Sequence, residues 1–234
     1  MIEQIKKGGF FRNLIVIEGN DGSGKATQAQ LLLEAMLEKG IDARKLSFPN
    51  YQSDSSALIK GYLAGRYGKR DDVSPYAAAS FYAADRIASY MEDWKADYEK
   101  GKLIIADRYT TSNAIYQCAR LPHIRRRRFL QWLYDYEYNL LGLPEPDMVI
   151  YLDVDPEVSM QLIEQRGEKK DIHEEDAVDM RQVHEASKFC ARKGGWERIN
   201  CCKDGKILPP EKIHEMIMDA ILDYEEWEKS EEMI

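Results

Sequence analysis

A glycine-rich segment near the start of the chain has the residue types and spacing of a phosphate-binding loop. Three glycines and a lysine follow an apolar run and open an amphipathic stretch. Glycines let successive backbone N–H groups converge on phosphate oxygens, and the lysine bridges neighbouring phosphate groups. We predict that this loop binds the phosphates of ATP, and a glycine-rich turn without a ligand is the alternative. Its residues are Gly19, Asn20, Asp21, Gly22, Ser23, Gly24, Lys25, Ala26 and Thr27.

The position after Lys25 departs from the usual pattern of such loops. Serine or threonine normally places a hydroxyl on Mg²⁺ there, whereas this chain has Ala26 followed by Thr27. One residue turns a helix by about 100°, so Thr27 cannot supply the same hydroxyl. Mg²⁺ would then be held by phosphate oxygens, water and a carboxylate.

A second charged group, Asp107-Arg108, ends the apolar run that starts at Leu103. An arginine can hold a phosphate through two hydrogen bonds, and an aspartate can position a metal ion or its water. Beside a phosphate-binding loop, this pair suits phosphoryl transfer between two anions, although a simple ion pair at a strand end is the alternative. A guanine-nucleotide switch is not favoured, because its base-reading Asn-Lys-x-Asp motif does not occur.

The elements that must position these residues alternate along the chain. Short apolar runs, each bounded by turn residues, alternate with longer amphipathic stretches, which predicts βαβ units and a parallel sheet with helices on both faces. We expect a single α/β domain over residues 1–234, with its ligand site at the carboxyl ends of the strands. The predicted strands are Leu14–Glu18, Ala43–Phe48, Leu103–Asp107, Met148–Asp153 and Trp196–Cys201.

Three helices are predicted most clearly, and each is followed by a glycine that can cap its end. Ser74 offers an N-cap for one of them, with a proline in its first turn. These helices are Lys25–Lys39, Pro75–Lys100 and Arg125–Leu141.

The composition excludes several classes of protein. Hydrophobic residues make up 44% of the chain and charged residues 32%, as in a globular protein. A net charge of -8 and a pI near 5.2 argue against a nucleic-acid-binding surface. The first 20 residues contain neither a signal peptide nor an apolar stretch of about 18 residues, so we expect a cytoplasmic protein. Four cysteines without paired spacing are expected to be reduced and mostly buried.

From Leu14 to about Asn200 the chain resembles the thymidylate kinase family. The phosphate-binding loop is similar to the one in that family, and further motifs match along the chain. They are Phe48-Pro49, Tyr82–Arg86, Asp107-Arg108-Tyr109, Ser112–Ala114 with Tyr116, Leu143–Asp147 and Leu152–Glu157.

The resemblance implies a three-layer fold like that of nucleoside monophosphate kinases, with a five-stranded parallel sheet and a short lid at about residues 165–173. It implies transfer of the γ-phosphoryl group of ATP to dTMP, giving dTDP and ADP, with Mg²⁺ as cofactor and a homodimer as the assembly. The reaction would need no covalent intermediate, because the dTMP phosphate is itself the nucleophile.

The resemblance also assigns residues to dTMP. Phe48 and Tyr82 would sandwich the thymine ring, although both could be ordinary core aromatics. Arg86 and Asn113 would bind O4 and N3 of the base, although Arg86 could instead form a solvated pair with Asp85. The whole set implied for dTMP is Asp21, Phe48, Tyr51, Tyr82, Arg86, Arg108, Asn113 and Tyr116.

Within this set, three residues would surround the sugar and phosphate. Arg108 would hold the phosphate, and Tyr116 would fill the space of a ribose 2′-hydroxyl. Asp21 would face the 3′-hydroxyl and the acceptor phosphate.

Catalysis would depend on cations that neutralise the transferred group. The family places an arginine either in the phosphate-binding loop or in the lid, and Gly22 occupies the loop position, so Arg166 would supply it. The catalytic residues implied are Lys25, Arg108, Arg166, Asp21 and Asp107, with Asp107 and Asp21 as metal ligands. A solvated turn is the alternative interpretation of the lid segment with Lys169 and Lys170.

The run Arg125–Arg128 is interpreted as a solvated helical face, balanced by Asp135 and Glu137. Rival functions remain open at this point. They are a kinase for another pyrimidine monophosphate or for a deoxynucleoside, and a nucleotide-binding regulator without catalysis, which Ala26 would favour.

Overall fold

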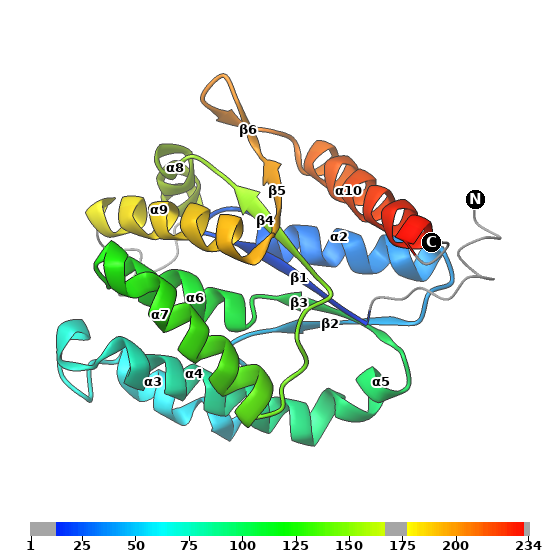
Figure 1. Cartoon of the computed structure of the whole chain (residues 1–234). Coiled ribbons are helices and arrows are strands. Elements are labelled where there is room, and N and C mark those ends of the chain that lie inside the picture. The colour runs from blue at the N-terminus through cyan, green and yellow to red at the C-terminus, as the bar shows by residue number, and fades with distance from the viewer. Residues whose placement is uncertain (1–12, 167–176, 232–234) are drawn as a thin grey trace.

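Five parallel strands form the central sheet. The computed structural model describes the backbone of residues 13–166 and 177–231, and the side chains of 13–164 and 180–223. The strand order is β2-β3-β1-β4-β5, with every neighbouring pair parallel, which confirms the predicted sheet (Figure 1). The strands are β1 (Leu14–Gly19), β2 (Ala43–Ser47), β3 (Leu103–Asp107), β4 (Met148–Asp153) and β5 (Glu197–Asn200).

Helices cover both faces of the sheet. In Figure 1, α2 and α10 lie on one side of the strands, and α3, α4, α6 and α7 lie on the other. None of the helices within the described residues is long and apolar enough to cross a membrane. Their bounds are α2 (Lys25–Glu38), α3 (Ala57–Leu63), α4 (Pro75–Ser89), α5 (Lys95–Glu99), α6 (Thr110–Ala119), α7 (His123–Tyr134), α8 (Pro156–Arg166), α9 (Ala177–Gly194) and α10 (Pro210–Glu231).

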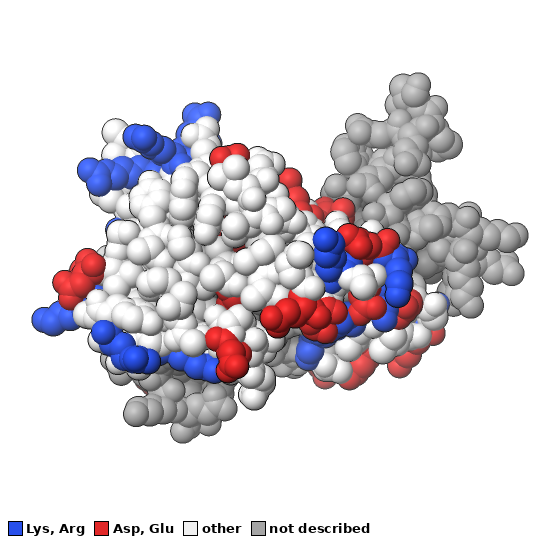
Figure 2. Space-filling model, turned by 90° about the horizontal axis from the view of Figure 1, so that it is seen from below, with Lys and Arg blue, Asp and Glu red and all other residues white. Residues whose placement is uncertain are grey.

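The surface on the side of α3, α4 and α5 has a broad area without charged residues. Figure 2 shows this area, with Lys, Arg, Asp and Glu gathered toward its edges. The exposed large hydrophobic side chains of this region include Leu58 in α3, Tyr76 in α4 and Met91 in the segment that follows α4.

Two of the predicted helices contain a wider turn than expected. Pro75–Lys100 is present as α4 and α5, joined by the π-helical turn η3 (Tyr90–Trp94), and η4 (Asp135–Leu140) continues α7. A π turn adds a residue to the helical repeat, so it rotates the side chains that follow. In η4 the only buried residue is Glu137, which therefore faces the interior.

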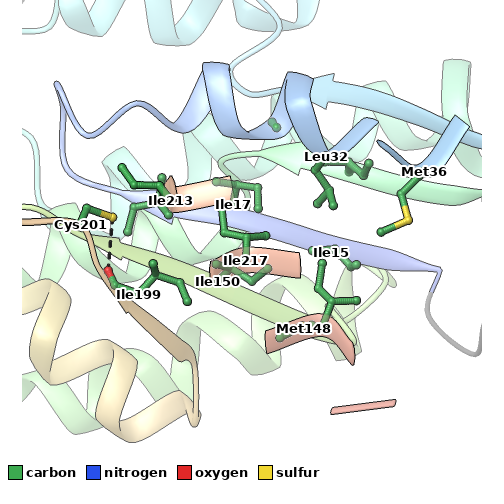
Figure 3. Close-up of a cluster of buried hydrophobic side chains, with 14 of the residues drawn as sticks. Ile15, Ile17, Leu32, Met36, Met148, Ile150, Ile199, Cys201, Ile213 and Ile217 are labelled. Carbon is green, nitrogen blue, oxygen red and sulfur yellow. Dashed lines mark hydrogen bonds between the residues drawn. The ribbon is translucent and has the colours of Figure 1, made fainter. Parts of the chain in front are cut away.

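The first face of the sheet is packed mainly with apolar side chains. Successive residues of a strand point to opposite faces, so Ile15 and Ile17 face α2 and α10, while Leu14 and Val16 face the other layer. Figure 3 shows this cluster, where Leu32 of α2 and Ile217 of α10 close over the strands. Burial of one such side chain contributes about 1.5–3 kcal/mol, so this layer stabilises the sheet.

The second face combines apolar packing with buried polar groups. Leu14 and Val16 pack with Trp94 and Tyr109, and the rings of Trp94 and Tyr109 lie 6.3 Å apart. Farther out, α4, α6, α7 and α9 share a separate apolar cluster. Buried polar side chains, among them Glu137, also lie on this side.

A short antiparallel hairpin between β5 and α10 was not predicted. Its strands are β6 (Cys202–Lys203) and β7 (Lys206–Ile207). Asp204 and Gly205 both have positive φ, as a two-residue hairpin turn of this type requires. The Asp-Gly pair in the sequence was the signal for this turn.

The cysteines are mostly buried, as predicted. Cys118, Cys190 and Cys201 are buried, and Cys202 is half-buried. Burial, with a smaller effect of Cys202, raises the pKa of Cys201 to about 12.

Candidate functional site

The candidate site lies where two neighbouring strands, β1 and β3, end. Ile17 of β1 pairs with Asp107 of β3, and the Arg108 N–H donates to the Ile17 carbonyl at 3.2 Å. The loop after β1 and the Asp107-Arg108 pair therefore meet at the carboxyl edge of the sheet. Open α/β sheets bind ligands at this edge.

The glycine-rich loop connects β1 to α2 in a tight turn. Gly22 has a φ of 76°, and a Cβ there would lie 2.7 Å from the Ser159 carbonyl oxygen of α8. Gly24 also has a positive φ, of 83°, immediately before α2. The loop thus packs closely against α8, the helix that leads to the predicted lid. A side chain larger than that of glycine at position 22 would require α8 to shift.

Lys25 starts α2 and is almost completely buried. Its Nζ donates to the Asn20 carbonyl at 2.6 Å, so the ammonium lies inside the loop. Burial, together with the charge of Arg108, lowers the pKa of Lys25 to about 8, although Asp21, Asp107 and Glu18 oppose the shift. The loop therefore holds a buried cation whose charged form a nearby phosphate would stabilise.

Arg108 has an uncommon backbone conformation and has polar partners at both of its terminal nitrogens. Its φ is 68°, in the left-handed region that residues other than glycine rarely adopt. Its Nη2 forms an ion pair with Asp21, and its Nη1 donates to the Tyr116 hydroxyl at 3.3 Å. Such backbone strain costs about 1–3 kcal/mol and is found mainly at functional sites.

Tyr116 completes this group from α6. Its hydroxyl donates to Oδ2 of Asp21 at 2.6 Å, and Arg108 lies 5.5 Å from the centre of its ring. Burial raises the pKa of Tyr116 well above its usual value, so the phenol stays protonated and donates. Asp21, Arg108 and Tyr116 thus form one hydrogen-bonded set at the loop.

One pocket collects all eight residues that the sequence assigned to dTMP. It encloses about 570 Å³ of empty space, including its mouth, between the carboxyl edge of the sheet, α3, α4 and α6. Five further lining residues had not been assigned to a ligand, although Pro49, Tyr109 and Ser112 belong to the motifs that matched the family. The pocket is lined by Asp21, Phe48, Pro49, Tyr51, Leu63, Tyr82, Arg86, Arg108, Tyr109, Ser112, Asn113, Tyr116 and Gln117.

The aromatic side chains of the pocket differ in burial. Phe48 is only 4% exposed and packs against Tyr109, with ring centres 5.8 Å apart. Tyr82 is half-buried, and Tyr51 is exposed at the rim. Phe48 therefore belongs both to the core and to the pocket wall, so the two interpretations made from sequence do not exclude each other.

Arg86 is not paired with Asp85, which had been the alternative. Its Nε and Nη2 donate to the two carboxylate oxygens of Glu137, at 2.7 and 2.6 Å. Asp85 instead accepts from the Asn50 N–H at 2.8 Å and from the Ser55 hydroxyl at 2.6 Å, which ties the loop after β2 to α4.

Glu137, one of the two acids noted after the Arg125–Arg128 run, is not at the surface. Its side chain is 0% exposed, and it contacts α4 and α6 through hydrogen bonds. The Arg125–Arg128 run is also not uniformly solvated, because Arg126 is 4% exposed and its Nε donates to the Leu121 carbonyl. Both residues lie at helical spacing from Leu130 and Leu133, so the apolar periodicity was a signal for their burial.

Asp21 and Asp107, the two metal ligands expected from sequence, have different surroundings. Both oxygens of Asp21 are engaged, one by Arg108 and one by Tyr116. The Asp107 carboxylate, which is 9% exposed, has no hydrogen-bond partner within the described residues. The described residues contain no cluster of three or more His, Cys, Asp or Glu side chains that could hold a metal ion.

The predicted lid can be located only in part. Arg166 is the last residue of α8, and its side chain lies outside the described part of the chain. Residues 167–176, with Lys169 and Lys170, also lie outside it.

A second, more open pocket lies on the other side of the glycine-rich loop, and no residue beyond the loop had been predicted for it. It has about 870 Å³ of empty space and combines loop residues with apolar side chains from α8, β7 and α10. It is lined by Gly22, Ser23, Gly24, Thr27, Gln28, Leu162, Ile207, Leu208, Pro210 and Ile213. The unpredicted hairpin thus ends in this wall.

Comparison with known proteins agrees with this geometry. Residues 17–207 match the model of the thymidylate kinase family. A thymidylate kinase of Caenorhabditis elegans is 32% identical over 209 residues, 85% of this chain and 86% of that protein. A thymidylate kinase of Mycobacterium tuberculosis is 34% identical over 172 residues, 70% and 78% of the two chains. A probable thymidylate kinase of Thermococcus onnurineus is 37% identical over 158 residues, 66% and 73%.

Proposed function

The chain belongs to the thymidylate kinase family, and from this premise we propose that it transfers the γ-phosphoryl group of ATP to dTMP. The observation that carries the proposal is the position of the glycine-rich loop between two pockets. Asp21 lines the first pocket, and the next residue, Gly22, lines the second. Two anionic substrates bound on opposite sides of this loop would meet at their phosphates, as in-line transfer requires.

The first pocket suits dTMP as the acceptor. Phe48 and Tyr82 offer aromatic faces for a pyrimidine, which would contribute about 1–3 kcal/mol of stacking energy. Arg86 and Asn113 would bind the edge of the base, and Tyr51 would cover it at the rim. Tyr116 would close the space beside the sugar and so favour deoxyribose.

The phosphate end of the same pocket is cationic. Arg108 would hold the dTMP phosphate, and its contact with Asp21 would give way to the substrate. Asp21 would then be available to the sugar 3′-hydroxyl. Lys25 would hold the ATP phosphates with the backbone N–H groups of the loop.

The second pocket suits ATP as the donor. Its apolar lining, which includes Leu208 after β7 and Ile213 in α10, would hold the adenine ring. Its loop residues lie beside the N-terminus of α2, which favours anions.

The residues present fit a Mg²⁺ ion held mainly by substrate. Ala26 offers no hydroxyl, and Asp107 is the acid at the site whose carboxylate has no hydrogen bond to any described residue. One carboxylate with phosphate oxygens and water is a usual environment for Mg²⁺. We propose Asp107 as the main ligand, with Asp21 secondary. The ion would neutralise phosphate charge.

The remaining parts of the proposal concern Arg166 and the assembly. Arg166 would neutralise charge on the transferred group, since Gly22 leaves the loop without an arginine. A homodimer in the cytoplasm is also proposed, and the uncharged surface by α3, α4 and α5 would be compatible with self-association (Figure 2). Sedimentation of the purified protein tests the dimer.

An acceptor panel tests the proposed function. The protein is incubated with ATP and Mg²⁺, and ADP formation is measured with dTMP, dUMP, UMP, dCMP, thymidine and deoxycytidine. We expect the highest kcat/KM with dTMP. A higher value with UMP or thymidine would favour the rival kinases, and tight ATP binding without ADP formation would favour a regulator.

A further inference from the structure

Glu137 lies beneath the acceptor pocket and is the acceptor of four hydrogen bonds. They come from Nε and Nη2 of Arg86, at 2.7 and 2.6 Å, from the Thr110 hydroxyl at 2.7 Å, and from Nδ2 of Asn113 at 2.9 Å. Glu137 itself does not line the pocket, but Arg86 and Asn113 do. One carboxylate therefore holds both of the side chains that face the base.

The contact with Glu137 fixes which donors Arg86 can offer. A guanidinium has five N–H groups in one plane. Because the edge formed by Nε and Nη2 faces Glu137, the Nη1 group is left for the pocket. Arg86 thus presents N–H donors to a ligand.

The same contact fixes the orientation of the Asn113 amide. Its Nδ2 donates to Glu137 at 2.9 Å and to the Ala79 carbonyl at 3.0 Å. Both partners are pure acceptors, so the NH₂ group must face them, and the reverse orientation would oppose oxygen to oxygen. Oδ1 is consequently directed away from Glu137, as an acceptor for a ligand.

We infer that Glu137 is a positioning residue that sets the hydrogen-bonding pattern of the pocket to a donor from Arg86 beside an acceptor from Asn113. This inference rests on the proposed function and deepens it. The pattern complements a pyrimidine with a 4-keto oxygen and an N3–H, which thymine and uracil share. Cytosine has an amino group at position 4 and a bare N3, so it would place donor against donor and acceptor against acceptor.

The charge of the pair agrees with a neutral ligand at this end of the pocket. Glu137 neutralises Arg86 in a site where both side chains are almost completely buried, at 0% and 3% exposure. Arg108, by contrast, is 20% exposed and lies at the phosphate-binding loop. Two arginines in one pocket are thereby given separate ligands, the base and the phosphate.

Stability alone does not account for this arrangement. The desolvation cost of a buried ion pair commonly cancels most of its attraction, so apolar residues of similar volume would serve packing equally well. Glu137 follows Leu130 and Leu133 at helical spacing, so a buried carboxylate occupies a position where an apolar side chain would continue the packed face of α7.

Glu137→Gln tests the inference with little change of shape. We expect kcat/KM for dTMP to fall by about 10- to 100-fold, because a Gln NH₂ would oppose a donor of Arg86 or Asn113. The ratio of kcat/KM for dTMP to that for dCMP should fall by at least about tenfold, while the KM for ATP changes less than about twofold. A purely structural role would lower active-site concentration without changing this ratio.

Two further variants keep the test decisive. Glu137→Asp retains the charge but is one methylene too short to hold Arg86 and Asn113 together, so it should shift the same ratio in the same direction. Asp135→Asn changes an exposed acid in the same turn and should leave all constants unchanged. Circular dichroism and thermal melting establish which variants fold.

The outcomes separate this inference from the proposed function. If the wild-type protein prefers dTMP but either folded Glu137 variant keeps the wild-type ratio, the inference falls and the function stands. If neither variant folds, Glu137 is structural and the inference also falls. If the wild-type protein prefers a 4-amino pyrimidine, both fall.

Discussion

The two faces of the central sheet use burial in different ways. The face under α2 and α10 is packed mainly with apolar side chains, such as Ile15, Ile17 and Ile217. On the other side, next to an apolar layer, the molecule buries charged groups, among them Arg86 and Glu137. The first face needs only volume and shape, whereas the second needs each polar group satisfied in one geometry.

This difference shows where sequence changes should affect stability and where they should affect activity. Apolar packing is non-directional, so damage to the first face should lower stability and leave the chemistry of folded molecules intact. Substitutions beside the acceptor pocket should lower activity more than stability. The following experiments try to break or sharpen this division.

The largest effect is expected for Arg108→Ala. Loss of a guanidinium that holds the acceptor phosphate should lower kcat/KM for dTMP by about 10³-fold, in the range of arginines in phosphoryl transfer. ATP affinity, measured by calorimetry, should stay within a few-fold. Arg108→Lys is the matched variant, since it keeps the charge without the bidentate geometry. Wild-type kinetics in Arg108→Ala would remove the assigned role.

Ile217→Ala should lower stability and spare the chemistry. Ile217 is 0% exposed in α10, and its truncation should reduce the free energy of unfolding by about 2–5 kcal/mol. Urea unfolding followed by circular dichroism measures this loss. Ile217→Val, which removes one methylene, should cost about 0.5–1.5 kcal/mol. A large fall in kcat/KM per folded molecule would contradict the division between the faces.

Arg126→Ala tests whether every buried charge on the second face contributes to activity at the acceptor pocket. Arg126 donates to the Leu121 carbonyl at 3.2 Å and lies 5.9 Å from the Phe189 ring centre. Its removal should cost about 1–3 kcal/mol of stability without changing kcat/KM. Arg127→Ala, on the exposed side of α7, is the control and should stay within about 0.5 kcal/mol. If Arg126→Ala and Arg127→Ala change stability equally, the whole run should be interpreted as a solvated face.

The smallest effect is a pH dependence of ATP affinity. The pKa of Lys25 is lowered to about 8 in the folded protein, so the side chain is half protonated near pH 8 and loses its charge as the pH rises further. ATP affinity should therefore fall by roughly tenfold between pH 7.5 and 9.5. Lys25→Met should bind more weakly with a flatter profile over this range. An unchanged slope in the variant would assign the titration to another group.

The same shift has a consequence for stability with the opposite sense. A lysine whose folded pKa lies below its usual value of 10.5 opposes folding while it is protonated. That penalty is present below pH 8 and disappears as the pH rises toward 10.5. Lys25→Met should therefore gain stability relative to the wild-type protein at pH 7 rather than at pH 10.

Much of the fold could be predicted because its signals are local. The strands Leu103–Asp107 and Met148–Asp153 have the predicted bounds, and Ser74 accepts from the Ala77 N–H as an N-cap. These features depend on neighbours within a few residues. The hairpin at Asp204-Gly205 had such a signal and was missed.

The interior partners could not be predicted in this way. Arg86 and Glu137 are separated by 51 residues, and although Glu137 lies four residues after the buried Leu133, no local pattern indicates which side chains it contacts. Sequence analysis assigned Arg86 a ligand only through a family resemblance.

The sequence by itself determined the order of strands and helices, the glycine-rich loop before Lys25, and the acid–arginine pair at the end of β3, because each is encoded within one segment. Only the tertiary structure decided that Glu137 holds Arg86 and Asn113 together, and that α8, β7 and α10 form the wall of a second pocket. Those outcomes depend on which distant helices pack together, since a buried charge is stable only where another segment supplies its partners.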